Sequence, residues 1–221
     1  MKSDKIYAVI PAYNEGKNIR QIIINTKKYI DNVIVVDDGS KDNTKSAAED
    51  TNVTILSHIV NLGKGATLRT GCDYALKKGA KYIVVLDADA QHNPKDIPRF
   101  LEKLKYYDIV FSYRKRSQKM PFILRFGNWF ISGSMALLYG IRLNDTQSGF
   151  RAFSKDAYKK IRWAASDYSM ETEMISRAGK QNLKYVQVPI ETIYSDNYKG
   201  TTIIDGVKII FNMIWWKIFR G

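Results

Sequence analysis

Short apolar runs alternate along the first half of the chain with longer stretches in which apolar residues recur at helical spacing. The apolar runs are typical of strands buried on both faces of a sheet, and they occupy residues 5–10, 32–37, 52–57, 81–87 and 108–112. The helical stretches lie between them, at residues 16–30, 42–50, 63–79 and 94–107. Pro94 suits the first turn of the last of these helices. This alternation predicts an α/β fold with a mostly parallel, doubly wound sheet flanked by helices.

Polar residues gather where three of the predicted strands end. The sequence reads PAYNE at residues 11–15, DDGS at residues 37–40 and DADAQ at residues 87–91. Each motif alone is compatible with an ordinary turn followed by a helix cap. Because ligands of such sheets bind beyond the carboxyl ends of the strands, we expect the three motifs to face one crevice. So many carboxylates in one place indicate a metal ion or a hydrogen-bonded ligand.

The third motif has the spacing of a cation site. If residues 87–91 are extended, then Asp87, Asp89 and Gln91 point to one face and bring three oxygen atoms together. Hard divalent cations prefer oxygen ligands, so these three residues are the predicted ligands of Mg²⁺ or Mn²⁺. Such an ion would also remove the repulsion between the two carboxylates.

The chain of 221 residues carries a net charge of +13, which favours anionic partners such as phosphorylated ligands, nucleic acid or an anionic membrane surface. Nucleic acid is disfavoured, because the sequence has no helix-turn-helix, zinc or RNA-binding signature and its acidic clusters would repel phosphates unless a metal ion intervened. Cys72 is the only cysteine, and together with His58 and His92 it cannot supply a Cys/His zinc site. The N-terminal residues show no signal-peptide pattern.

Five motifs, in this order, carry a resemblance to a known family: IPAYNE, VVDDGS, NLGKG, DADAQH and DTQSGFRAF. They resemble the family 2 glycosyltransferases, and within that family the polyprenyl-phosphate glycosyltransferases of the dolichyl-phosphate mannose synthase type. The resemblance extends over roughly residues 5–200. It implies the GT-A fold, a Rossmann-like, mostly parallel sheet flanked by helices, and an enzyme that uses a nucleotide-sugar donor.

The resemblance also assigns the donor site. It implies donor contacts from residues that follow the first, second and fourth strands, namely Pro11, Tyr13, Glu15, Asp38, Asp87, Ala88 and Asp89. Tyr13 is expected to lie against the base, and Asp38 to bind the base or the ribose. The glycines of NLGKG would allow the backbone to approach the donor closely. Lys64, between them, is either a charged contact of the donor or a solvated residue at a helix start.

The acceptor is expected to be a phosphate, which is anionic near neutral pH and needs no general base. It needs positive charge, and the resemblance assigns that role to Arg114 and Arg125, which with Asp89 form the expected catalytic set. Asp145 and Gln147, in DTQSGFR, are expected at the edge of the site. Arg151 either orients that loop or forms a structural ion pair, and neither Glu171 nor Glu173 is expected to act as a base.

Two segments predict contact with a membrane surface. Residues 122–141 are about long enough to span a bilayer, but Arg125 and Asn128 interrupt them, so we expect interfacial amphipathic helices. Residues 203–221 follow the GT-A domain of residues 1–202 and predict an amphipathic helix at the membrane interface; a helix packed on the core is the alternative. The expected location is peripheral, on the cytoplasmic face of a membrane, with an anchoring subunit among the partners considered.

The function expected from the sequence is a metal-dependent, inverting transfer of a hexose from a nucleoside diphosphate sugar to dolichyl or polyprenyl phosphate. Mannose from GDP-mannose is favoured. UDP-glucose as the donor and a sugar hydroxyl as the acceptor are alternatives. A sugar nucleotidyltransferase is the alternative of a different class, although the glycine-rich start with Arg and Lys that such enzymes carry after their first strand is missing.

Overall fold

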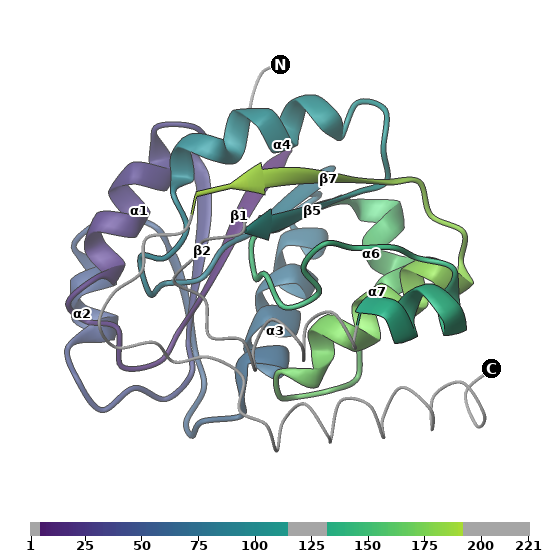
Figure 1. Cartoon of the computed structure of the whole chain (residues 1–221). Helices are drawn as coiled ribbons and strands as arrows, with labels where there is room; N and C mark the ends of the chain where they lie inside the picture. Colours follow the sequence, from purple (N-terminus) through teal and green to yellow (C-terminus); the bar gives the residue numbers. More distant parts are fainter. Residues whose placement is uncertain (1–4, 115–131, 192–221) are drawn as a thin grey trace.

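The computed structural model describes residues 5–114 and 132–191, which form an α/β sandwich with one central sheet (Figure 1). Within these residues the sheet has seven strands in the order β3-β2-β1-β4-β6-β5-β7. The strands are β1 (Ile6–Ala12), β2 (Asn32–Asp37), β3 (Thr54–Ser57), β4 (Tyr82–Val85), β5 (Ile109–Arg114), β6 (Arg151–Ser154) and β7 (Tyr185–Ile190). The helices are α1 (Ile19–Lys27), α2 (Thr44–Glu49), α3 (Lys64–Lys77), the 3₁₀ turn η1 (Pro94–Asp96), α4 (Ile97–Lys103), α6 (Lys155–Ile161) and α7 (Ser169–Lys180).

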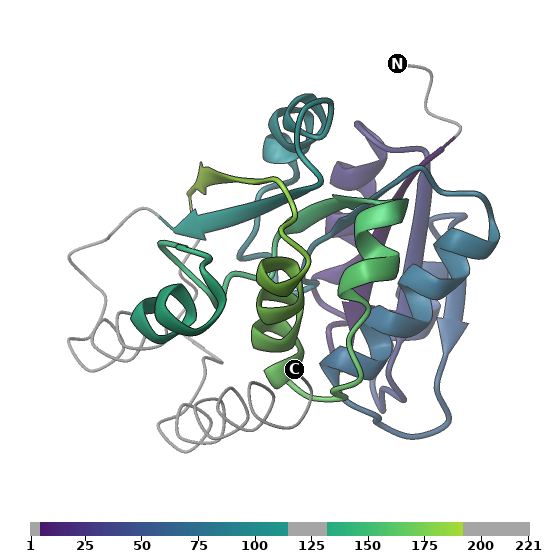
Figure 2. The ribbon, with the colours of Figure 1, turned by 90° about the vertical axis from the view of Figure 1, so that its right-hand side faces the viewer.

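Helices cover both faces of the sheet, and the alternation of side chains along each strand explains how. In β2, Val33 and Val35 belong to the apolar cluster that also contains residues of α1, α2 and α4, whereas Ile34 and Val36 belong to the cluster that contains residues of α3, α6 and α7. Turned by 90°, α6 and α7 lie side by side in front of the sheet, next to α3 (Figure 2). Both faces of the central strands are therefore covered, which is why those strands are apolar throughout.

The elements lie where the sequence predicts them, with one correction. The second strand has the predicted bounds, and Pro94 begins η1, where the Asn93 side chain accepts a hydrogen bond from the Lys95 amide. The strand predicted over residues 52–57 was expected to be buried on both faces, and that expectation is wrong. In β3 no residue is fully buried, because β3 is an edge strand that pairs only with β2.

β6 is antiparallel to both of its neighbours, β4 and β5, whereas all other neighbouring strands in the described sheet are parallel. The amino end of β6 therefore lies at the same edge as the carboxyl ends of the other strands. Arg151, its first residue, is in register with Val85 on one side and Phe111 on the other. This orientation brings the loop before β6, which carries the motif DTQSGFR, to the edge where ligands of α/β sheets bind.

Some sequence predictions concern residues outside the described part of the chain. Arg125 and the helix expected over residues 203–221 lie there, and so does the first half of the segment 122–141. Residues 132–139 of that segment are helical. Among the helices that the structure describes, none combines the length and the hydropathy needed to cross a bilayer.

Candidate active site

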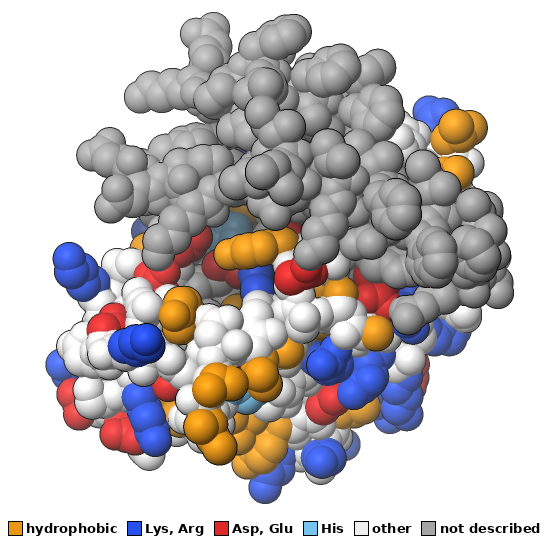
Figure 3. Space-filling view, turned by 90° about the horizontal axis from the view of Figure 1, so that it is seen from below, with side chains coloured by type: hydrophobic (Ala, Val, Ile, Leu, Met, Phe, Trp, Pro, Cys, Tyr) orange, Lys and Arg blue, Asp and Glu red, His pale blue; other side chains and the backbone are white. Residues whose placement is uncertain are grey.

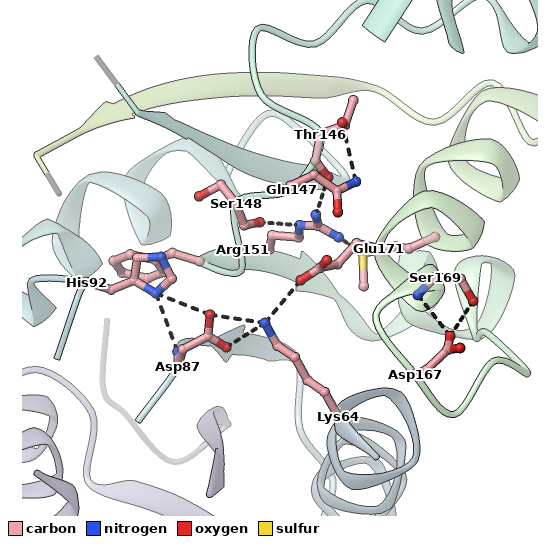
Figure 4. A network of polar contacts seen from close by, with 12 residues as sticks. Lys64, Asp87, His92, Thr146, Gln147, Ser148, Arg151, Asp167, Ser169 and Glu171 are labelled. Carbon is pink, nitrogen blue, oxygen red and sulfur yellow. Dashed lines mark hydrogen bonds and ion pairs between the residues drawn. The ribbon is translucent and has the colours of Figure 1, made fainter. Parts of the chain in front are cut away.

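The centre of the site is a buried ion pair around Lys64, the first residue of α3 (Figure 4). Its Nζ lies 2.9 Å from Oδ1 and 3.1 Å from Oδ2 of Asp87, and 3.1 Å from Oε1 of Glu171 on α7. Burial alone would lower the pKa of Lys64, but the two carboxylates raise it well above its usual range. Lys64 is therefore protonated and paired. The interpretation of Lys64 as a solvated residue at a helix start, one of the two that the sequence allowed, is wrong.

Asp87 lies two residues beyond the end of β4, and its carboxylate is adjacent to both Lys64 and His92. Nδ1 of His92 is 3.8 Å from Asp87 Oδ2 and accepts a hydrogen bond of 3.4 Å from the Asp87 amide. Burial would raise the pKa of Asp87, but the ammonium group of Lys64 keeps it below its usual value, so Asp87 is ionised. Burial lowers the pKa of His92, although Asp87 and Asp89 oppose that shift, and the neutral ring suits its role as an acceptor.

Gly149, in the loop before β6, packs directly against Asp87. A Cβ atom at this position would lie 2.2 Å from Asp87 Oδ2, far closer than two atoms can approach without a bond. The loop therefore touches the carboxylate only because residue 149 has no side chain. This contact explains the glycine of DTQSGFR as a packing requirement of the site.

Asp89 and Gln91 depart from the extended geometry that the sequence analysis assumed. Ala90 has φ = 61°, in the left-handed region, and the Gln91 amide donates to Asp89 Oδ1 at 3.0 Å. The chain therefore turns at Ala90, and the alternation of side chains does not extend from Asp87 to Gln91. Asp87, Asp89 and Gln91 remain the predicted ligands. The reason given for Gln91, that an extended chain points it to the same face as the two acids, is wrong.

The acidic side chains at this edge of the sheet suit a divalent cation only in part. In the described part of the chain, no three His, Cys, Asp or Glu side chains are grouped as a complete metal site. Mg²⁺ is commonly held by one or two carboxylates and completed by substrate phosphates and water. Asp87 and Asp89 fit such a partial shell, and Gln91 stays the predicted third ligand.

Asp38, at the carboxyl end of β2, has a different environment. Its carboxylate accepts hydrogen bonds of 2.9 Å from the amides of Leu62 and Gly63, and it lies 2.7 Å from His58 Nδ1. Burial would raise its pKa, but these hydrogen bonds hold the pKa below the usual value. Asp38 therefore fixes the loop between β3 and α3, and its contact with the donor stays a prediction.

The loop that Asp38 fixes exposes hydrophobic side chains, since Ile59 is 100% and Val60 is 60% exposed. Its last residue, Gly63 (φ = 92°), and Gly65 pack against backbone carbonyls of residues 165 and 166, at 2.5 Å or less from an added Cβ. The close approach expected for these glycines is therefore made to the protein's own backbone.

Seen from below, acidic and basic side chains gather near the middle of the face, at the border of the residues not described (Figure 3).

The remaining donor residues lie at the end of β1. Tyr13 follows the strand and is 41% exposed, so its ring is accessible to a base. Pro11 is half-buried and pairs with Val36 of β2. Glu15 Oε2 accepts a hydrogen bond of 3.0 Å from Asn18, and Ala88 is buried next to Asp87. These positions are compatible with the predicted donor contacts, which stay predictions.

Arg114 ends β5 and is held by Asp145. Its Nε donates to Asp145 Oδ2 at 2.6 Å, and its Nη2 donates to Asp145 Oδ1 at 3.1 Å. This two-point contact fixes the plane of the guanidinium group at the edge of the site. The predicted partner of Arg114, Arg125, lies outside the described residues, so the structure does not test whether the two arginines converge.

Arg151 orients the loop before β6, as one of its two interpretations predicts. The side chain is buried, and it donates at 2.9 Å to the backbone carbonyls of both Thr146 and Ser148. Gln147, between them, has a buried Oε1 atom with no hydrogen-bond partner among the described residues. Arg151 therefore holds the backbone of this loop in place at Thr146 and Ser148.

The two glutamates of α7 have separate roles. Glu173 accepts hydrogen bonds from the amides of Ala164 (3.0 Å) and Ala165 (2.9 Å) and pairs with Arg177 at 2.7 Å. It therefore holds the segment before α7, whereas Glu171 pairs with Lys64. Sequence analysis missed Glu171 as a partner of Lys64, and no local pattern could reveal it, because the two residues are 107 positions apart.

Comparison with known proteins identifies the class. The family model described as Glycosyl transferase family 2 matches residues 7–162, and the chain belongs to that family. The fold is GT-A: a glucosyl-3-phosphoglycerate synthase from Mycobacterium tuberculosis, solved in complex with Mg²⁺ and uridine diphosphate, has a similar structure. The TM-score is 0.77 at 18% identity, over 97% of this chain and 79% of that chain.

Two relatives act on lipid phosphates according to their names. A UDP-N-acetylglucosamine–dolichyl-phosphate N-acetylglucosaminyltransferase of Methanococcus voltae is 35% identical over 246 residues, 99% of this chain and 98% of that protein. An undecaprenyl-phosphate mannosyltransferase of Micrococcus luteus is 28% identical over 200 residues, 84% of this chain and 82% of that protein. The resemblance to family 2 glycosyltransferases is thus confirmed, and with it the assignment as a glycosyltransferase.

Proposed function

We propose that this protein transfers a sugar from a nucleoside diphosphate sugar to the phosphate of a polyprenyl phosphate, with inversion at the anomeric carbon. The observation that carries the proposal is the arrangement at one edge of the sheet. There the acidic pair Asp87 and Asp89 follows β4, and a fixed arginine, Arg114, ends β5. A site that combines acids suited to a cation with a guanidinium group suits two anionic substrates.

Asp87, Asp89 and Gln91 would hold Mg²⁺ or Mn²⁺ together with the diphosphate of the donor. The ion would act as a Lewis acid that neutralises the charge of the departing diphosphate. Tyr13 would lie against the base, while Pro11, Glu15, Asp38 and Ala88 would line the nucleoside.

Arg114 and Arg125 would bind the acceptor phosphate and hold its oxygen in line with the anomeric carbon. Most of the acceleration would come from this positioning, because two anions repel each other in solution. The environment of the two glutamates supports a phosphate acceptor. Glu171 is paired with Lys64 and Glu173 with backbone amides and Arg177, so neither is available as a general base.

The sugar is the finer question. Sequence analysis favours mannose from GDP-mannose, and the name of the Micrococcus luteus relative, 28% identical, supports mannose as the sugar. The Methanococcus voltae relative is more similar, at 35% identity, and its name specifies UDP-N-acetylglucosamine. UDP-N-acetylglucosamine is therefore the first donor to test, followed by GDP-mannose and UDP-glucose.

The acceptor requires access to a bilayer. A net charge of +13 supports peripheral binding to an anionic, cytoplasmic membrane face, with residues 122–141 and 203–221 as the proposed contacts. Sedimentation with liposomes tests this proposal. Binding should be stronger to anionic than to neutral vesicles and should weaken as salt screens the charges.

The decisive assay offers the purified full chain one labelled donor at a time, with Mn²⁺, dolichyl phosphate and a mixture of free oligosaccharides. We expect label in the lipid fraction and free nucleoside diphosphate as the second product. Label confined to oligosaccharides would mean that a sugar hydroxyl is the acceptor. A parallel reaction with a nucleoside triphosphate and a sugar 1-phosphate tests the other class: release of pyrophosphate there, with the labelled donor left unused, would indicate a nucleotidyltransferase.

A further inference from the structure

The ammonium group of Lys64 lies where a cation at Asp87 would also have to bind. It is 2.9 Å and 3.1 Å from the two oxygens of the Asp87 carboxylate, so both are engaged (Figure 4). The side chains of Lys64 and Asp87 are 16% and 19% exposed, so water screens the charges only partly. The ammonium group of Lys64 would therefore strongly repel a divalent ion that binds to Asp87.

Glu171 gives Lys64 a second partner within the site. Its carboxylate is 3.1 Å from Lys64 Nζ, and its side chain is only 4% exposed on the first turn of α7. The ring of Tyr168 lies 5.6 Å from the same nitrogen, within the range of a cation–π contact. When Asp87 takes a metal ion, Lys64 can remain paired with Glu171 and stay in the site.

We propose that Lys64 is a built-in counter-ion of Asp87, which keeps the affinity for divalent metal low until a nucleoside diphosphate binds. The diphosphate brings the negative charge that both cations need, so metal and nucleotide should bind cooperatively. By linkage, the nucleotide must raise metal affinity by the same factor by which the metal raises nucleotide affinity. This inference rests on the proposed metal role of Asp87 and Asp89.

The test measures Mn²⁺ binding to the full chain by electron paramagnetic resonance of free Mn²⁺, alone and with saturating UDP or GDP. For the wild type, we expect the nucleotide to tighten Mn²⁺ binding by about tenfold or more. Lys64→Gln should bind Mn²⁺ alone about tenfold more tightly than the wild type, and the gain from nucleotide should shrink. Lys64→Arg, which keeps the charge, should stay close to the wild type.

Lys77→Gln is the matched control, because it removes the same charge from the exposed, opposite end of α3 and should behave as the wild type. Thermal unfolding by circular dichroism checks that each variant is folded. The cooperativity between Mn²⁺ and nucleotide is measured in the wild type, so that part of the test does not depend on any variant. Equal Mn²⁺ affinity with and without nucleotide, or no gain in Lys64→Gln, overturns the inference and leaves the proposed function standing. Absence of Mn²⁺ binding even with UDP and GDP overturns the metal role and the inference together.

Discussion

Asp38 and Asp87 follow the two strands that flank β1, and both are ionised and largely buried at the same edge of the sheet. Their partners differ. Asp38 accepts hydrogen bonds from two backbone amides and lies against His58, whereas both oxygens of Asp87 face the ammonium group of Lys64. Similar positions in the sheet therefore give two kinds of carboxylate.

The difference indicates what each carboxylate can do. Backbone amides are fixed by the fold, so a carboxylate that binds them holds a loop in place. A lysine side chain has four rotatable carbons and a compact charge, so its partner can be exchanged for another cation. We therefore expect substitutions around Asp87 to affect chemistry, and substitutions at Asp38 to affect stability.

The largest expected effect is that of Asp89→Ala, which removes a predicted metal ligand. Turnover should fall by ~10³-fold, since the charge of the leaving diphosphate would lose its stabilisation. Unfolding should change little, because Asp89 accepts one hydrogen bond from Gln91 within its own turn. The measurements are initial rates and thermal melts, with the exposed Asp156→Ala as the control. Unchanged activity in excess chelator would contradict the metal assignment.

Arg114→Ala comes next. Transfer to the lipid phosphate should fall by ~10²-fold because the nucleophile loses its positioning, while donor binding should change much less. Rates with saturating donor and calorimetric titration of the donor separate the two quantities. Arg99→Ala is the control, since Arg99 is exposed and its contacts with Asp96 and the Pro189 carbonyl lie at the surface.

The opposite pattern would be informative. If Glu171→Gln abolished transfer while Arg114→Ala left it intact, a sugar hydroxyl would be the acceptor and Glu171 its base. The phosphate acceptor and the inverting mechanism proposed for it would then both be wrong.

Gly149→Ala, which disturbs the position of Asp87, should have a smaller effect on turnover. The new Cβ would overlap Asp87 Oδ2 and displace the carboxylate without removing its charge. Turnover should fall on the order of tenfold, as expected for a misplaced rather than a missing group. Asp156→Ala, at an exposed position of α6 outside the proposed site, is again the control. Equal activity of the two variants would show that the placement of Asp87 is not critical.

Periodicity in the sequence predicted the parallel half of the sheet well, because strand burial and helix spacing are local properties. It could not predict that β6 runs antiparallel, since the direction of a strand depends on its long-range partners. The same limit applies to the site. The acids at the ends of β2 and β4 were found from local motifs, but the pairing of Lys64 with Glu171 depends on how α7 packs against α3.

Two local errors also have physical causes. The edge position of β3 could not be read from its apolar residues, which are like those of the central strands. The turn at Ala90 went unrecognised because alanine rarely adopts a positive φ. In both places the tertiary structure overrides the preference of the local sequence.

The smallest effect on turnover, and the clearest effect on stability, is expected for Asp38→Asn. One carboxylate oxygen becomes an amide that cannot accept from Leu62 or Gly63, so the free energy of unfolding should fall by ~1–3 kcal/mol. Turnover should fall only several-fold, since the loop is loosened rather than lost.

The pH dependence of this loss can be worked out from the direction of the pKa shift. The pKa of Asp38 is lower in the folded than in the unfolded protein, so its contribution is fully present above the unfolded value, about 4, and is lost as the pH falls through the folded value. Urea unfolding of wild type and variant at several pH values should therefore give curves whose difference shrinks below about pH 4. If Asp38→Asn instead weakened donor binding more than a hundredfold at unchanged stability, the donor contact proposed for Asp38 would outweigh its role in the loop, and the contrast with Asp87 would fail.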